Sequence, residues 1–121
     1  MNYIIVTNNP SVAGELEDKA DIKYSNVSFL ELLLLVRDMV HMGHSLMSHP
    51  LSGSVKPMET PYKSIVISKK KNGFDMESLN LIESAIESCR KFKAKFPDMP
   101  DDMLKDYQLV DLALIKSALD I

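Results

Sequence analysis

Residues that could do chemistry are concentrated in one stretch of the chain, residues 41–63. It contains all three histidines, His41, His44 and His49, together with hydroxyl and charged side chains. From 49 to 63 it has neither the 3.6-residue period of a helix nor the two-residue period of a strand. A patternless segment of this length in a small domain is usually functional or disordered. Its mixture of His, Tyr, Lys, Glu and Thr with rigid prolines predicts an ordered binding loop.

The group Ser52-Gly53-Ser54, followed closely by Lys56, is the part of this loop best suited to an anion. Glycine lets the backbone approach a ligand, hydroxyl and amide groups donate hydrogen bonds, and lysine adds positive charge. The spacing matches neither a Walker motif nor Gly-x-Gly-x-x-Gly. The same residues are also typical of a tight turn with solvated polar groups. A small-anion or metabolite site and a plain turn are therefore the two interpretations.

The candidate ligand-binding set combines this loop with the polar residues that follow the first predicted strand. It consists of Thr7, Asn8, Asn9, His49, Ser52, Gly53, Ser54, Lys56, Glu59, Thr60, Tyr62 and Lys63. Ligands of α/β sheets bind beyond the carboxyl ends of the strands. We expect these residues to form the wall of one polar pocket at that edge of the sheet.

Neither a metal site nor a catalytic group is indicated. A zinc or iron site needs three or four converging ligands at recognised spacings, and His41, His44 and His49 lack such spacings. No Gly-x-Ser-x-Gly nucleophile elbow is present. Glu59 and Lys63 are more typical of a surface ion pair than of an acid–base pair. We therefore predict no catalytic residue, no metal and no cofactor.

Composition favours one soluble domain covering residues 1–121. The chain is 45% hydrophobic and 26% charged, which is ordinary for a globular protein. The net charge of −3 argues against nucleic-acid binding. The longest apolar run, Leu32 to Val36, is far shorter than the about 20 residues of a membrane span. The start has no signal-peptide pattern, and the single cysteine, Cys89, fits a reducing cytoplasm.

Periodicity and capping residues predict four strands and four helices. Strands are expected at 3–7, 21–25, 44–48 and 63–69. Helices are expected at 11–18, at 28–42, over about twenty residues from Asp75, and from Pro100 onward. The last helix is expected to bury an apolar face made of Met103, Leu104, Tyr107, Val110, Leu114 and Ala118.

The alternation of strands and helices predicts an α/β fold. We expect a single three-layer domain, with a small, mostly parallel sheet of about four strands and flanking helices. The direction of the last strand is left open. The helix at 28–42 is apolar nearly all round, so it is either buried on several sides or packs against another chain. Together with the last helix, it predicts excess apolar surface in a small chain and hence a homodimer.

The chain resembles the GrdX family over nearly its whole length. The most specific part is the central block that begins at His44, with the letters HSLMSHPLSGSVKPMETPYKSIVIS. Similarity extends through IIVTNNP near the start, VRDMVHMGH before the central block, and MESLNLIESAI after it. The part after Phe96 is the least distinctive.

The resemblance implies a biological setting rather than a reaction. Members of this family are small proteins encoded with the glycine, sarcosine and betaine reductase system of amino-acid-fermenting anaerobes, which works with selenoprotein and thioredoxin partners. This chain lacks the cysteines of that chemistry, so the resemblance implies a cytoplasmic accessory protein whose partners are components of the reductase complex. Two alternatives remain: a small enzyme acting on a phosphorylated or nucleotide-like metabolite, and a purely structural interaction domain.

Overall fold

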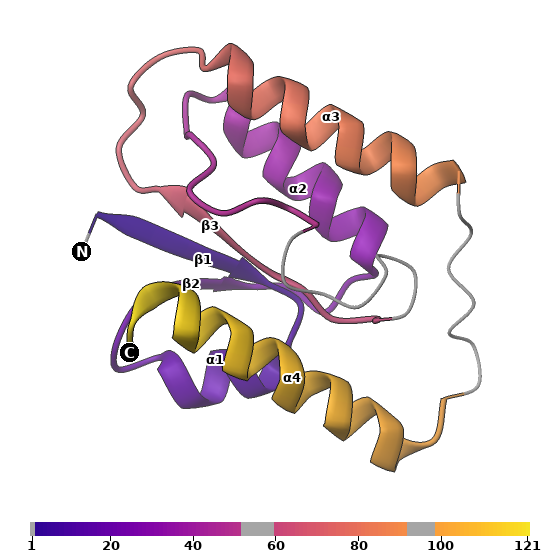
Figure 1. Ribbon diagram of the computed structural model, residues 1–121. Helices are drawn as coiled ribbons and strands as arrows, with labels where there is room; N and C mark the ends of the chain where they lie inside the picture. The colour runs from indigo at the N-terminus through magenta and orange to yellow at the C-terminus, as the bar shows by residue number, and fades with distance from the viewer. Residues whose placement is uncertain (1, 52–59, 92–98) are drawn as a thin grey trace.

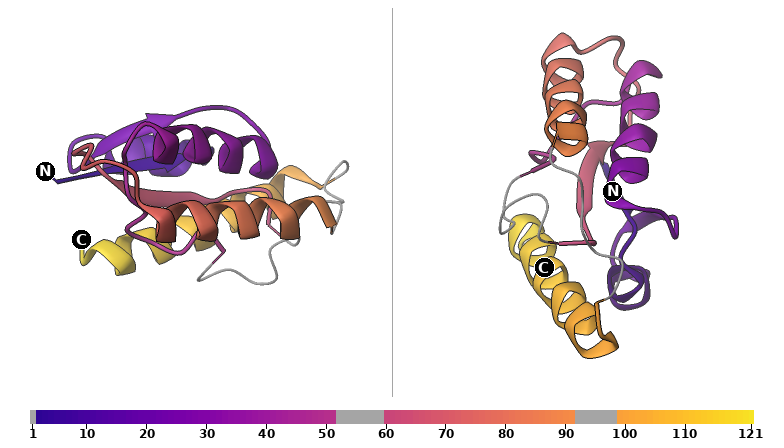
Figure 2. Two further views of the ribbon diagram at one scale, coloured as in Figure 1. Left: turned by 90° about the horizontal axis from the view of Figure 1, so that it is seen from above. Right: turned by 90° about the vertical axis from the view of Figure 1, so that its right-hand side faces the viewer.

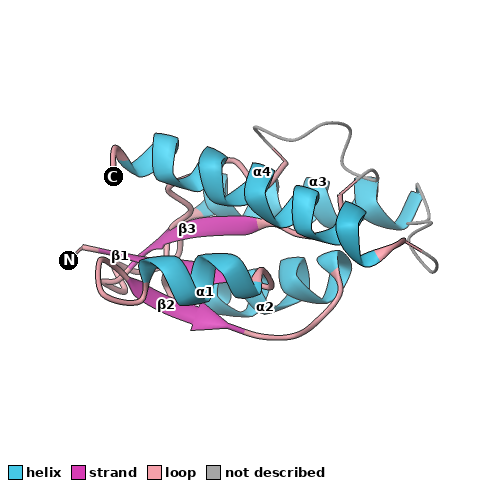
Figure 3. Ribbon diagram, turned by 90° about the horizontal axis from the view of Figure 1, so that it is seen from below, coloured by secondary structure: helices cyan, strands magenta, loops and turns pink. Residues whose placement is uncertain are grey.

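A three-stranded sheet lies between two pairs of helices in the computed structural model, which describes residues 2–51, 60–91 and 99–121 (Figure 1). The strands are β1 (Tyr3–Thr7), β2 (Asp21–Tyr24) and β3 (Ser64–Ser68). The helices are α1 (Pro10–Leu16), α2 (Phe29–His41), α3 (Met76–Lys91) and α4 (Asp101–Leu119). Helices α2 and α3 cover one face of the sheet, and α1 and α4 cover the other (Figures 2 and 3). The expected α/β class and its layers are confirmed.

The sheet itself differs from the prediction. Its order is β2-β1-β3, with β1 parallel to β2 and antiparallel to β3, so it is mixed rather than mostly parallel. The reason lies in the path between α2 and β3. Helix α2 returns the chain to the amino edge of the sheet, and residues 44–48 then run back toward the carboxyl edge, antiparallel to β3. Strand β3 therefore starts at the carboxyl edge, where Ser64 pairs with Thr7.

The expected strand at 44–48 is reduced to one isolated bridge, between Leu46 and Ile67. Beside that bridge the Met47 amide donates to the Val66 carbonyl and the Ser68 amide donates to the Ser45 carbonyl, and serine side chains supply further hydrogen bonds. The Ser68 hydroxyl accepts a hydrogen bond from the Ser45 amide. The Ser48 hydroxyl accepts one from the Val66 amide. Serine side chains can compete with sheet hydrogen bonding, and the described chain has three strands instead of the predicted four.

Helices α1 and α2 begin where local capping residues dictate. Asn9 precedes α1, its side chain accepts a hydrogen bond from the Ser11 amide, and Pro10 takes the first helical position. Ser28 and Glu31 form a reciprocal capping box at the start of α2. The carboxylate of Glu31 accepts from the Ser28 backbone, which lowers its pKa. These short-range bonds fix the two helix starts that follow the parallel strands.

The apolar circumference of α2 is largely covered within the chain. One side packs on the sheet, and the other packs on α3, forming the larger hydrophobic core. Leu32, Leu33, Val36 and Val40 are all fully buried there. Each such side chain contributes roughly 1.5–3 kcal/mol relative to an exposed one. The surface expected to mark α2 as a dimer contact is thus mostly internal, and the homodimer itself stays a prediction.

The predicted apolar face of α4 is wrong in its orientation. The side chains buried against α1 and β3 are Asp111 and Ile115, with Leu112 and Leu119 packed at the margin of the smaller core. Met103, Val110 and Leu114, which were expected to be internal, are exposed instead. Apolar residues occur around most of this helix, so periodicity alone did not select the side that faces the sheet.

No described helix combines the length and the apolar character needed to cross a membrane. The end predicted for the third helix, with Phe92, Phe96 and Pro97, lies outside the described residues. Within them, α3 ends at Lys91, close to the carboxyl edge of the sheet where the polar residues gather.

Candidate functional site

Thr7 ends β1 at the carboxyl edge of the sheet and is fully buried. Its hydroxyl lies 2.7 Å from the hydroxyl of Ser64 at the start of β3. Because Ser64 Oγ donates to Asp111 Oδ2 at 2.7 Å, the Thr7 hydroxyl is the donor to Ser64. The Thr7 oxygen also accepts from the Asn9 amide at 3.0 Å. Thr7 therefore joins the two strands and starts a buried chain of hydrogen bonds that ends on a carboxylate.

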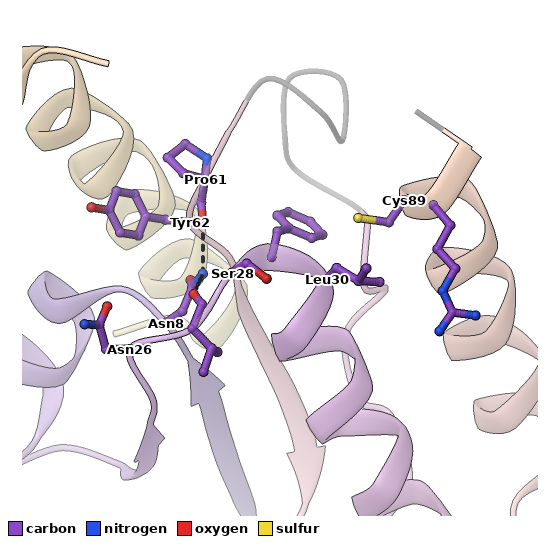
Figure 4. Close-up of a pocket in the computed structure, with 10 residues that line it drawn as sticks. Asn8, Asn26, Ser28, Leu30, Pro61, Tyr62 and Cys89 are labelled. Carbon is purple, nitrogen blue, oxygen red and sulfur yellow. Dashed lines mark hydrogen bonds between the residues drawn. The ribbon is translucent and has the colours of Figure 1, made fainter. Parts of the chain in front are cut away.

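Asn8 clamps together three segments of the chain. Its Nδ2 donates to the carbonyl of Val27, before α2, and to the carbonyl of Pro61, before β3, at 3.0 and 2.9 Å. Its Oδ1 accepts from the Lys63 amide at 2.9 Å. With both amide hydrogens used, the side chain holds the β2–α2 connection against residues 60–63. The bond to Pro61 is visible in Figure 4.

Asn9 attaches α4 to the end of β1 by side-chain hydrogen bonds. Its Nδ2 donates to the carbonyl of Gln108 at 2.9 Å and to Asp111 Oδ2 at 3.0 Å. Its Oδ1 caps α1 by accepting from the Ser11 amide. One buried amide thus fixes the start of α1 and the middle of α4 relative to β1.

Asp111, like Ser64, belongs to this cluster although the sequence did not single it out. It is 5% exposed and accepts three hydrogen bonds, from the Ser64 amide, the Ser64 hydroxyl and Asn9. Lys63 is buried beside it. Burial lowers the pKa of Lys63 because it removes water from the ammonium group, and the negative charge of Asp111 opposes this by a smaller amount. We call Thr7, Asn8, Asn9, Lys63, Ser64 and Asp111 the polar cluster.

Thr60 and Tyr62 form a local turn that leads into the polar cluster. The Thr60 hydroxyl donates to the Tyr62 carbonyl at 3.1 Å and accepts from the Tyr62 amide at 3.2 Å. The phenol oxygen of Tyr62 accepts from Gln108 Nε2 at 3.0 Å. Tyr62 is thereby held between α4 and a cavity on its other side.

A cavity of about 630 Å³ opens at the carboxyl ends of β1 and β2 (Figure 4). Its walls come from five places: the end of β1, the β2–α2 connection, the first turn of α2, residues 61 and 62, and the last turn of α3. The apolar lining residues are Val27, Phe29, Leu30, Pro61 and Tyr62. The polar and charged ones are Asn8, Asn26, Ser28 and Arg90. The volume falls within the roughly 300–1,000 Å³ that is usual for small-molecule sites.

The described lining offers two sources of positive charge that could hold an anionic group. Arg90 brings a guanidinium group, and the amino end of α2 adds the partial positive charge of its dipole. Cys89 also lines the cavity, but burial raises the pKa of its thiol. A thiol with a raised pKa is a weak nucleophile at neutral pH. The described lining therefore suits a small molecule with an apolar part and a polar or anionic group.

The histidines lie in three different surroundings. His41 is exposed at the end of α2, with its ring 6.5 Å from that of Phe74. His44 is buried and donates from Nδ1 to the Ser68 carbonyl at 2.7 Å. His49 is exposed and accepts at Nδ1 from the Leu51 amide. Among the residues with described positions, no group of three His, Cys, Asp or Glu side chains could hold a metal.

Half of the candidate set is brought together at the carboxyl edge. Thr7, Asn8, Asn9, Thr60, Tyr62 and Lys63 are neighbours there. His49 is not among the residues that line the cavity. Ser52, Gly53, Ser54, Lys56 and Glu59 lie outside the described residues. Ligand contact by any member of the set stays a prediction.

Several further residues belong to the site without having been predicted, Ser64 and Asn26 among them. Asp111 and Gln108 anchor α4, and Arg90 stands at the cavity. Asp111 had one available signal, because it stands four residues before Ile115 and so shares its buried side of the helix. Arg90 had none, since an arginine in the last turn of an amphipathic helix is ordinary.

A comparison with known protein families shows which family the chain belongs to. The family model described as GrdX-like protein matches residues 4–120. The chain belongs to the GrdX-like family. This confirms the resemblance seen in the central block and in the flanking segments. Searches of curated proteins and of solved structures found no match.

Proposed function

We propose that this GrdX-like chain is a cytoplasmic accessory protein of a glycine-reductase-type fermentation system, and that it binds a small metabolite in the cavity at the carboxyl ends of β1 and β2. The observation that carries the proposal is the cavity of about 630 Å³ at the sheet edge where ligands of such folds bind. The family match supports the setting only through the family name.

The described lining supports one class of ligand. Phe29, Leu30 and Pro61 offer apolar contact, so part of the ligand is carbon-rich. Arg90 offers a fork of donors that matches a carboxylate or phosphate group. The ligand is therefore a small organic acid, amino acid derivative or acyl phosphate with an anionic end. Binding without chemistry is favoured over catalysis because Cys89, the thiol in the described lining, has a raised pKa.

Isothermal titration calorimetry with glycine, sarcosine, betaine, acetyl phosphate, inorganic phosphate and nucleotides tests the proposal. At least one of these compounds should bind to the wild-type chain. Arg90→Ala should weaken the Kd of that compound by roughly tenfold or more, because a charge-assisted hydrogen bond is lost. Lys91→Ala is the matched control, since Lys91 is the next basic residue of α3 and does not line the cavity.

A second variant tests the cavity independently of charge. Leu30→Trp places a larger side chain in the lining and should abolish binding while circular dichroism keeps the wild-type spectrum. The proposal fails if no compound of the panel binds. It also fails if Arg90→Ala and Lys91→Ala weaken binding equally, because the anion would then be attracted by general charge alone.

The proposed association with reductase components has its own test. Purified components of a glycine reductase complex are mixed with the chain and followed by sedimentation velocity. A shift of the chain to a faster-sedimenting species supports the accessory role. Unchanged sedimentation with every component would restrict the proposal to the metabolite site.

A further inference from the structure

Tyr62 stands between the ligand cavity of the proposed function and a smaller hollow beside α4. It lines the cavity, and it also lines the hollow, whose apolar walls on α4 are Tyr107, Val110 and Leu114. Among the described lining residues, Tyr62 is the one that the two spaces share. Figure 4 shows Tyr62 and Cys89 on opposite sides of the cavity. The half-buried ring of Tyr62 therefore forms the wall on the α4 side.

The backbone on both sides of Tyr62 is held by side chains. The Thr60 hydroxyl donates to the Tyr62 carbonyl at 3.1 Å and accepts from the Tyr62 amide at 3.2 Å. Asn8 donates to the Pro61 carbonyl at 2.9 Å and accepts from the Lys63 amide at 2.9 Å. The backbone of Tyr62 therefore moves away from the cavity only if these hydrogen bonds break.

Gln108 holds the far end of the same side chain. Its Nε2 donates to the phenol oxygen of Tyr62 at 3.0 Å. Its Oε1 accepts from the Ser11 hydroxyl at 2.9 Å, so both ends of the amide are used. Its backbone carbonyl accepts from Asn9 Nδ2 at 2.9 Å, which fixes this turn of α4 on the end of β1. A donor that is itself anchored on two sides thus fixes the position of the Tyr62 ring.

We propose that Tyr62 is the specificity-determining residue of the ligand cavity, and that Gln108 is the positioning residue that keeps its ring in place. This inference rests on the proposed metabolite site. Arg90, which follows Cys89 in α3, holds the anionic group of the ligand, and the apolar part extends toward Tyr62 on the other side. The ring limits the length of that part. The ligand class is an organic anion whose carbon skeleton ends before the ring.

The space behind the ring suits a carbon chain, but the ring closes it. The smaller hollow has a volume of about 10 Å³, room for no more than about one water molecule. Without the ring, the cavity would join this hollow, whose wall on α4 is apolar. A longer chain would then gain apolar contact where the wild type gives a clash. Selection against longer ligands is therefore steric.

Isothermal titration calorimetry with straight-chain carboxylates, from acetate to decanoate, tests the size limit. In the wild type, affinity should rise about fourfold with each methylene withdrawn from water, and it should stop rising at the length that meets the ring. In Tyr62→Ala the rise should continue beyond that length. Tyr107→Ala is the matched control, because Tyr107 lines the hollow but not the cavity, and it should keep the wild-type limit. Circular dichroism checks that the variants are folded.

The role of Gln108 is tested at the same limit. Gln108→Met removes the donor to the phenol, and Tyr62→Phe removes the acceptor. Each should raise the affinity of the first acid beyond the limit by about fourfold, the gain of one buried methylene. The double variant should give no further gain, because the same hydrogen bond is lost. Gln108→Glu should restore the wild-type limit, since its carboxylate accepts from the phenol hydroxyl. If Gln108 were merely structural, Gln108→Met would lower the free energy of unfolding without moving the limit.

The outcomes separate this inference from the proposed function. A wild-type affinity that keeps rising to decanoate, or a limit that Tyr62→Ala leaves unchanged, overturns the role of Tyr62 while the metabolite site stands. A limit that neither Gln108→Met nor Tyr62→Phe moves overturns the positioning role, and these two variants carry the test if Tyr62→Ala does not fold. If no carboxylate binds although a compound of the metabolite panel does, only the inference is wrong. If nothing binds, both are rejected.

Discussion

Asn9 and Asp111 are separated by 102 positions in the chain, yet Asn9 Nδ2 donates a 3.0 Å hydrogen bond to Asp111 Oδ2. Asn9 caps α1, and Asp111 lies in the middle of α4. The same carboxylate accepts from the backbone and the hydroxyl of Ser64, at the start of β3. A single buried acid thus attaches the C-terminal helix to the first helix and to the sheet.

Replacement of Asp111 should lower the free energy of unfolding. Asp111→Ala leaves the Ser64 amide, the Ser64 hydroxyl and Asn9 Nδ2 without their acceptor in a buried place. Because unsatisfied buried donors are expensive, the free energy of unfolding should fall by about 2–4 kcal/mol in urea denaturation. The control is Asp106→Ala on the exposed side of the same helix, which should change stability by less than about 0.5 kcal/mol. Equal losses in the two variants would mean that Asp111 does not anchor α4.

The clamp made by Asn8 gives a second prediction. Asn8→Ala removes the donors to Val27 and Pro61 and the acceptor for the Lys63 amide. We expect a loss of about 2 kcal/mol in the free energy of unfolding, because the buried Lys63 amide loses its partner. Asn26→Ala is the control, since Asn26 is exposed at the same cavity. Amide hydrogen exchange should show earlier opening at Lys63 in Asn8→Ala only.

Lys63 should make stability depend on pH in the alkaline range. Its folded pKa is lowered by burial, so the unfolded chain binds more protons between the folded pKa and 10.5. Stability from this group therefore rises as pH increases through that window, and it is lost as pH falls through the folded pKa. Cys89 acts in the opposite direction, because burial raises its pKa and the folded thiol keeps its proton longer.

The contribution of Lys63 to the pH dependence of stability is obtained by comparing the wild type with a variant that lacks this lysine. The free energy of unfolding of the wild type minus that of Lys63→Met should rise with pH below 10.5, since Cys89 is the same in both proteins. Lys105→Met, at an exposed position of α4, should keep the wild-type pH dependence because Lys63 is still present. A difference curve that is flat or falls with pH would show that burial does not lower the pKa of Lys63.

Substitution by alanine should change the free energy of unfolding in opposite directions at two glycines. Gly43 follows α2 with φ at +108°, and an added Cβ would lie 3.2 Å from Lys71 Cβ. Gly43→Ala should therefore lower the free energy of unfolding by about 1–3 kcal/mol. Gly14 lies inside α1, where an added Cβ would meet nothing within 4 Å. Gly14→Ala should raise it by about 0.5–1 kcal/mol. Thermal denaturation of the pair measures both, and a destabilised Gly14→Ala would contradict the expectation from helix propensity.

The elements that follow from nearby residues were predicted well. Asn8 or Asn9 was the possible cap before Pro10, and Asn9 is the one that caps α1. Ser28 with Glu31 marks the start of α2, because each of these caps is a hydrogen bond between residues two or three positions apart. Strand β1 is a short β-branched run with no competing helical period. The turn after α2 is set by Gly43, which takes a φ that other residues adopt only with strain.

The candidate site was predictable only in its location. Thr7, Asn8 and Asn9 were expected to lie near the loop of residues 49–63, of which 60–63 are at this edge, if the first and third predicted strands, 3–7 and 44–48, ran parallel. They do lie near them: residues 44–48 run antiparallel to β3 and hence in the direction of β1, and Thr7 pairs with Ser64 at the start of β3. The cavity residues Asn26 and Arg90 carry no sequence signal, because they become neighbours through the packing of α2 on α3.

The sequence by itself determined the caps, the number of helices and the polar character of the carboxyl edge, since these depend on residues within a few positions of one another. Only the tertiary structure decided the direction of β3 and the side of α4 that faces the sheet. Apolar residues lie on two sides of α4, with Leu112, Ile115 and Leu119 on one and Met103, Val110 and Leu114 on the other. The choice between them depends on Asp111, whose partners Ser64 and Asn9 lie 47 and 102 positions away in the chain. A buried carboxylate needs those donors, so the fold turns Asp111 inward and leaves Met103, Val110 and Leu114 exposed.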